Sequence, residues 1–122
     1  MKKNTSLVFT GDIGFDRYMY GKWDDENLIS QEILDFLHSA DHVITNVEGP
    51  VAEAETNTTQ SGVQQLLHTI DPKAVKVLNN MKADIWNICN NHIMDAGPYG
   101  IESTLKSAKE NNVQTLGAGM DI

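Results

Sequence analysis

Short apolar, β-rich runs alternate along this chain with segments whose apolar residues recur at helical spacing. Strands are predicted at residues 6–10, 42–47, 84–89 and 113–116. Helices are predicted at 28–37, 71–81 and 97–108. Such alternation is typical of βαβ units, so we expect an α/β fold with a mostly parallel sheet flanked by helices.

The 122 residues suffice for a single domain with one modest core. The strand and helix pattern stops directly after the fourth strand, which predicts that the chain is the N-terminal part of a larger domain. Residues 52–62 are rich in Glu, Thr, Asn, Gln and Ser and predict a long polar loop. The edge of such a half-sheet would favour a homodimer.

The net charge of -8 disfavours nucleic acids and anionic membranes as partners, because both would be repelled, whereas cations would be attracted. The N-terminus has an apolar run too short for a signal-peptide core or a membrane span, which would make a chain with this native N-terminus cytoplasmic. The one cysteine, Cys89, lies in an apolar run and is expected to be a buried small hydrophobic residue.

Polar residues collect where three of the predicted strands end, and ligands of open parallel sheets bind at these carboxyl ends. The residues are Asp12 after the first strand, Asn46 and Glu48 at the second, and Asn91, His92 and Asp95 after the third. Carboxylates, a carboxamide and an imidazole suit Mn, Fe, Zn or Mg, and a bridging carboxylate would suit a pair of ions.

Several of these residues also have a simpler interpretation. Asp12 in a Gly-Asp pair is typical of a turn, and Glu48 before Gly-Pro is typical of a solvated loop. Asp95 is the natural hydrogen-bonding partner of His92. Arg17 could bind an anionic group or form an ordinary ion pair, and His68 is a weaker candidate for substrate contact.

The chain resembles the bacterial capsule synthesis (CapA) family of poly-gamma-glutamate production, which is similar to the calcineurin-like metallophosphoesterases. The matching stretches are FTGDIGFDR, ADHVITNVEGPV, ADIWNICNNHIMDAGPYGIESTL and VQTLGAG. They cover essentially the whole chain in the order and spacing of the family.

The resemblance implies roles for individual residues. It makes Asp12 the first metal-binding carboxylate, Glu48 the bridging position with Asn46 beside it, and Asn91 the metal-binding carboxamide. His92 would bind metal or protonate a leaving group, and Asp95 would orient it. Gly14 stands where the superfamily usually has a histidine, and the later block of histidine ligands has no counterpart in this sequence.

Two functions follow from this resemblance. The first is a metal-dependent, phosphoesterase-like hydrolase acting on a phosphoester. The second is a non-catalytic module that binds metal or an anionic polymer and assists polymer assembly or export. Because the chain is acidic, binding of a polyanion would require bridging cations.

Overall fold

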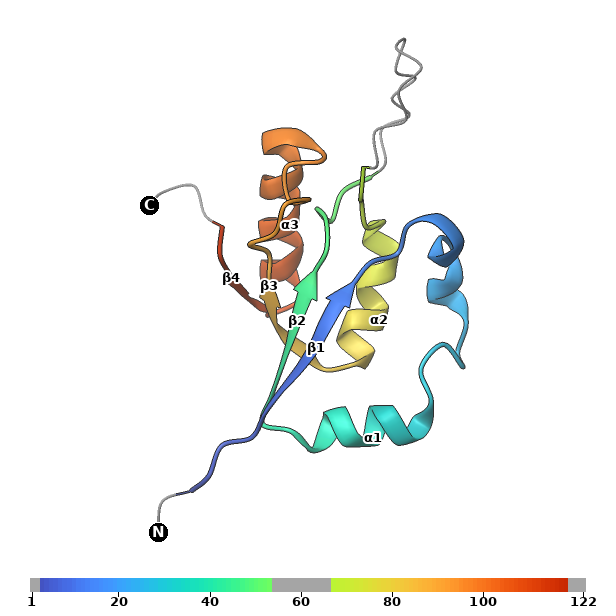
Figure 1. Cartoon of the computed structure of the whole chain (residues 1–122), viewed down its shortest axis with the longest axis vertical. Helices are drawn as coiled ribbons and strands as arrows, with labels where there is room; N and C mark the ends of the chain where they lie inside the picture. The colour runs from blue at the N-terminus through green and yellow to red at the C-terminus, as the bar shows by residue number, and fades with distance from the viewer. Residues whose placement is uncertain (1–2, 54–66, 119–122) are drawn as a thin grey trace.

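The computed structural model describes residues 3–53 and 67–118 as a parallel sheet with helices (Figure 1). The elements are β1 (Leu7–Ile13), α1 (Gln31–Ser39), β2 (His42–Val47), α2 (Val75–Asn80), β3 (Ala83–Asn87), α3 (Gly97–Glu110) and β4 (Gln114–Leu116). The strands lie in the order β1-β2-β3-β4, and each neighbouring pair is parallel. The predicted α/β class is therefore confirmed. Residues 54–62 of the predicted polar loop lie outside the described ranges.

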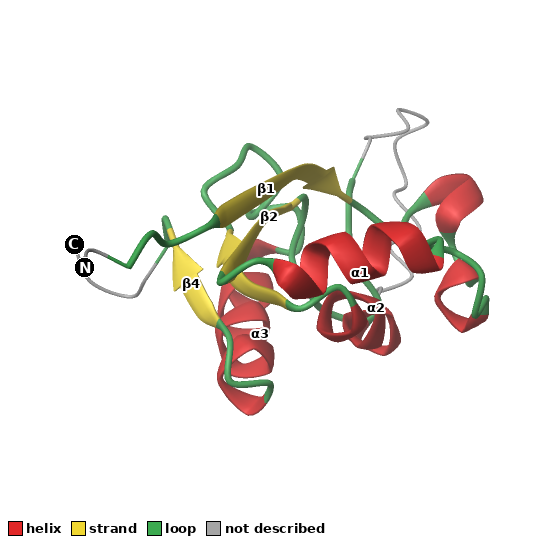
Figure 2. Ribbon diagram, turned by 90° about the horizontal axis from the view of Figure 1, so that it is seen from below, coloured by secondary structure: helices red, strands yellow, loops and turns green. Residues whose placement is uncertain are grey.

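The three α-helices lie on the same side of the sheet (Figure 2), as right-handed crossovers between sequential parallel strands require. Strand residues facing the helices are buried, among them Val43, Thr45 and Trp86. On the opposite, uncovered face, side chains of the two edge strands are exposed, with Phe9 70% and Leu116 52% exposed, whereas Ile44 and Ile85 of the central strands are half-buried. The core of the described chain is thus built on one face of the sheet.

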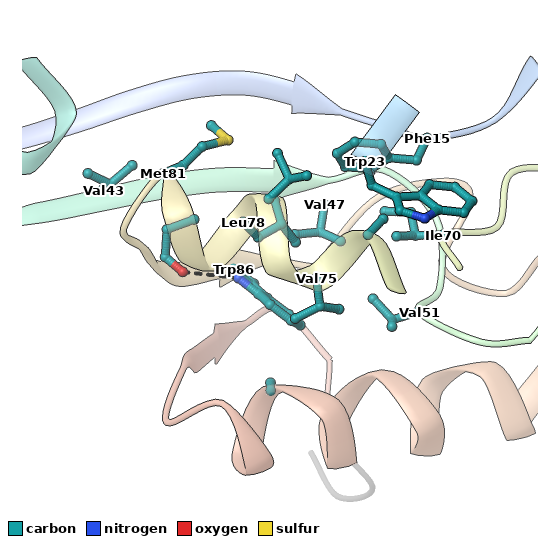
Figure 3. Close-up of a cluster of buried hydrophobic side chains, with 14 of the residues drawn as sticks. Phe15, Trp23, Val43, Val47, Val51, Ile70, Val75, Leu78, Met81 and Trp86 are labelled. Carbon is teal, nitrogen blue, oxygen red and sulfur yellow. Dashed lines mark hydrogen bonds between the residues drawn. The ribbon is translucent and has the colours of Figure 1, made fainter. Parts of the chain in front are cut away.

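Trp86 is the largest fully buried side chain and fills the space between α2 and α3 (Figure 3). Its indole Nε1 donates a hydrogen bond to the carbonyl oxygen of Ala83 at 3.1 Å, so the buried N–H has a partner. Phe15 and Trp23, from the segment after β1, extend the same core toward Ile70. The loop that follows β1 is therefore anchored in the core.

Helix α3 is docked by one buried threonine. The Thr104 hydroxyl accepts a hydrogen bond from the backbone N–H of Val51 at 2.8 Å and donates one to the carbonyl oxygen of Gly100 at 2.7 Å. Gly100 in turn lies against Pro50, where an added Cβ would come within 3.0 Å of the proline ring. These contacts fix the N-terminal half of α3 against the segment that follows β2. No helix in the described ranges is long and apolar enough to cross a membrane.

Cys89 is exposed, so the expectation that it is buried was wrong. Strand β3 ends at Asn87, and Ile88 takes the last buried position of this run. The next residue turns away from the core, close to Gly117, where an added Cβ would overlap that of Cys89. The apolar run therefore continues past the strand, but its burial does not.

Asp84 joins the start of β3 to β2, and its ionisation should make the fold sensitive to acid. Its two carboxylate oxygens accept hydrogen bonds from the backbone N–H of Val43 and from His42 Nδ1, both at 2.7 Å. Burial raises the pKa of Asp84, but these hydrogen bonds outweigh burial and hold the pKa below its usual 3.8. A lowered pKa stabilises the folded state above the ordinary value, and this contribution is lost as the pH falls through the folded-state value.

We therefore expect Asp84→Ala to be less stable than the parent chain near neutral pH. The difference should shrink as the pH falls through the lowered pKa of Asp84, because the parent carboxylate then takes up a proton and its contribution is lost. Urea unfolding of both proteins across a series of pH values from neutral to acidic measures this. A difference that stays the same over the whole series would contradict the assignment.

Candidate functional site

A row of polar side chains crosses the sheet near the carboxyl ends of three strands. The register of the sheet places Asn46 beside Asp12 on one side and beside Asn87 on the other. Asn87 Nδ2 donates to Asn46 Oδ1 at 3.0 Å, and Asn46 Nδ2 donates to Asp12 Oδ1 at 2.6 Å. The two carboxamides thus orient the Asp12 carboxylate and occupy one of its oxygens.

Asn90 fixes the turn that follows β3. Its Nδ2 donates to the carbonyl oxygen of Val47 at 2.8 Å and to Asn46 Oδ1 at 3.3 Å. Its Oδ1 accepts a hydrogen bond from the backbone N–H of His92 at 3.1 Å. The first asparagine of the pair therefore supports the loop, whereas Asn91 is exposed and can meet a ligand through its Oδ1.

The two ring nitrogens of His92 meet different partners. Nδ1 lies 2.8 Å from Asp95 Oδ2, a contact that spans three residues within one turn. Nε2 lies 3.2 Å from Asn91 Nδ2 and 3.9 Å from Glu48 Oε1. A carboxylate on Nδ1 favours the tautomer whose Nε2 carries a free lone pair, which Asn91 can approach as a donor.

His68 reaches this group from a distant part of the sequence. Its segment pairs with the chain after β2 through the Val51–Ile70 bridge, in which Ile70 N–H donates to the carbonyl oxygen of Pro50 at 2.9 Å. Gly49 permits this approach, because an added Cβ would lie 2.6 Å from the carbonyl oxygen of His68. The backbone N–H of His68 then donates to Asp95 Oδ2 at 2.7 Å.

The two imidazoles are in contact. The ring centroids of His68 and His92 lie 4.0 Å apart, with the planes inclined at 50°. His68 Nδ1 is buried and lies 2.8 Å from Asp16 Oδ2, although the carboxylate is out of line with the ring N–H and makes no directed hydrogen bond with it. Asp16 contacts the ring of His68, and Asp95 contacts the ring of His92.

A cavity of about 690 Å³ opens beside these strand ends. Its polar lining residues are Thr10, Asp12, Asp16, Arg17, Tyr18, Glu48 and His68. Apolar side chains of β1 and α1, including Val8, Ile33 and Phe36, line the rest. Because three of these polar residues are carboxylates, the lining suits a cation, or an anionic group accompanied by one, beside an apolar part.

The donor types at the site match hard divalent cations, because carboxylate and carboxamide oxygens and an imidazole are all present. Within the described ranges, however, no three His, Cys, Asp and Glu side chains gather closely enough to form a metal site. The residues therefore fit a metal in their chemistry and would have to move together, or gain further ligands, to enclose one.

The predicted residues fall into two neighbouring groups. Asp12 and Asn46 are hydrogen-bonded in the polar row, whereas Glu48, Asn91, His92, Asp95 and His68 form the imidazole cluster. Arg17 is exposed and contributes to the cavity lining.

The supporting role of Asn87 was not predicted. The sequence does contain a signal for it. Asn46 and Asn87 each follow a β-branched or aromatic residue at the end of a strand, and in the structure the parallel register places the two asparagines side by side.

Comparisons with known proteins agree with the motifs. The family described as bacterial capsule synthesis protein PGA_cap matches residues 6–122. The chain is 32% identical over 119 residues to the PGA biosynthesis protein CapA of Bacillus subtilis (strain 168), covering 96% of this chain and 31% of that protein. It is 26% identical over 126 residues to the capsule biosynthesis protein CapA of Bacillus anthracis, covering 97% of this chain and 30% of that protein. The chain thus spans under a third of the length of these relatives, and it belongs to the bacterial capsule synthesis protein family PGA_cap.

Proposed function

We propose that this chain serves capsule or poly-gamma-glutamate biosynthesis through a metallophosphoesterase-like site at the carboxyl ends of its parallel strands. The observation that carries the proposal is the imidazole of His92, held on Nδ1 by Asp95, with Nε2 directed toward Asn91 and Glu48. Both relatives carry biosynthesis of this kind in their names. The substrate class we infer is a phosphoester.

In this proposal Asp12, Glu48, Asn91 and His92 hold one or two divalent ions of Mn, Fe, Zn or Mg. A bound metal of this kind lowers the pKa of water and neutralises charge on a phosphoryl group. The Asn46 hydrogen bond keeps one oxygen of Asp12 occupied and so directs the other outward. Asp95 keeps a proton on His92 Nδ1, so that Nε2 can serve in one of two ways: as a further metal ligand, or as the atom that exchanges a proton with the substrate.

The cavity beside the strand ends supports a phosphoester as substrate. Arg17 in its lining can contact an anionic group, whereas Val8 and Phe36 would accept the apolar part of an ester. The carboxylates Asp12, Asp16 and Glu48 in the same lining would repel an unescorted anion. A divalent cation would remove that repulsion.

The alternative is a non-catalytic module that binds an anionic polymer through bridging cations and assists its assembly or export. The separation of the candidate ligands in the described part of the chain favours this reading over efficient hydrolysis. Polyglutamate would then bind in the presence of divalent metal, and phosphoesters would not be cleaved.

A thermal-unfolding titration with Mn²⁺ tests the metal site. Specific binding should stabilise the parent chain by about 2.7 kcal/mol when free metal is about 100 times the dissociation constant. Asp12→Asn and His92→Ala should lose this stabilisation. Glu110→Gln, an exposed carboxylate at the far end of α3, should keep it.

Hydrolysis of p-nitrophenyl phosphate with Mn²⁺ then separates the two functions. His92→Ala is expected to lower turnover by about 10²–10⁴-fold. Unchanged turnover in this variant would refute the proposed role of His92. Metal binding and polyglutamate binding without turnover would favour the alternative.

A further inference from the structure

Two carboxylate–imidazole pairs are packed against each other at the site, and the proposed function gives a catalytic role to only one of them. His92 pairs with Asp95, and His68 pairs with Asp16, with 2.8 Å between the nearest atoms in each case. The rings of the two histidines are 4.0 Å apart. His68 therefore covers one face of the imidazole that the proposed function relies on.

His68 is itself held at three points. The Val51–Ile70 bridge fixes its segment, its backbone N–H is bonded to Asp95, and its ring meets the Asp16 carboxylate. Its side chain is only 16% exposed. Such a ring cannot easily turn away, so it limits how far its neighbour can rotate.

Asp95 links the two histidines directly. The same oxygen, Oδ2, receives the backbone N–H of His68 and the Nδ1–H of His92. The backbone contact fixes the carboxylate, the carboxylate selects the His92 tautomer, and the His68 ring limits the tilt of the His92 ring.

We propose that His68, held by Asp16, is a positioning residue that keeps His92 with Nδ1 on Asp95 and Nε2 toward Glu48. The effect on catalysis rests on the proposed function, whereas the effect on the ring of His92 does not. Without the His68 ring, the His92 imidazole gains free space on one face. It can then leave Asp95 and adopt the other tautomer.

The test compares His68→Ala, His68→Phe and Asp16→Ala with the parent chain. Imidazole ¹⁵N–¹H spectra report which ring nitrogen of His92 carries the proton, and p-nitrophenyl phosphate hydrolysis reports kcat and KM separately. His68→Ala should shift His92 from the Nδ1–H tautomer toward a mixture and lower kcat by about 10–100-fold with little change in KM. His68→Phe, which keeps an aromatic face, should restore the tautomer and most of kcat. Asp16→Ala should fall between the two.

Two results would overturn the proposal. The first is a His92 tautomer and kcat unchanged in both His68→Ala and Asp16→Ala. The second is a raised KM with an unchanged tautomer, which would make His68 a direct substrate contact. Should His68→Ala fail to fold, Asp16→Ala and His68→Phe decide between these outcomes. Should the parent hydrolyse nothing, the proposed function fails while the tautomer spectra still decide the positioning role.

Discussion

Replacing Trp86 by alanine is expected to lower the free energy of unfolding by about 3–5 kcal/mol, enough to unfold much of the population of a marginally stable chain. Trp86 is fully buried between α2 and α3, against Val75 and Leu78 (Figure 3). The helices cover only one face of the sheet, so few other large side chains could fill the resulting cavity. The loss should therefore be near the upper end of the range.

Urea unfolding followed by circular dichroism measures this change. Phe9→Ala is the matched control, because Phe9 is also a large aromatic strand residue but lies on the uncovered face, 70% exposed. It should alter the free energy of unfolding by less than about 0.5 kcal/mol. An equal loss in both variants would contradict the one-sided core and would mean that the uncovered face is buried in solution.

The fold could be predicted from hydrophobic periodicity because the strongest patterns coincide with real elements. The run at 42–47 is β2, and the helical spacing after Gly97 is α3. Asp71 caps the turn before α2 by accepting a hydrogen bond from Lys73 N–H at 2.9 Å, as its position before proline indicates. Strand ends were less predictable. The Gly11-Asp12 pair is typical of a turn in the sequence, yet β1 continues through it. Gly11 lies inside the strand with a φ of 79°.

The site could be predicted only where its residues follow one another in sequence or end neighbouring strands. The contact between His92 and Asp95 depends on local spacing, and the pairing of Asp12 with Asn46 depends on strand register. The place of His68 on top of His92 depends on the Val51–Ile70 bridge. No local pattern encodes a bridge between two short segments, so this contact became visible only in the structure.

Gly49→Ala is expected to disturb both the fold and the site, because Gly49 lies just after β2 and against the backbone of His68. Its φ of 103° disfavours any side chain, and an added Cβ would lie 2.6 Å from the carbonyl oxygen of His68. Backbone strain costs about 1–3 kcal/mol and steric overlap about the same again. The overlapping atom belongs to the backbone, so relief requires the segment of His68 to move away from Pro50 and Asp95.

The imidazole spectrum of His92 and urea unfolding measure the two consequences together. Gly21→Ala isolates the strain, since Gly21 has a φ of 77° but no atom within 4 Å of an added Cβ. It should cost only about 1–2 kcal/mol and leave His92 unchanged. If Gly49→Ala behaves like Gly21→Ala in both measurements, the approach of His68 to Gly49 does not hold the site together. If Gly49→Ala is less stable than Gly21→Ala and also shifts the His92 tautomer, then the Val51–Ile70 bridge after β2 is needed to orient the imidazole of His92.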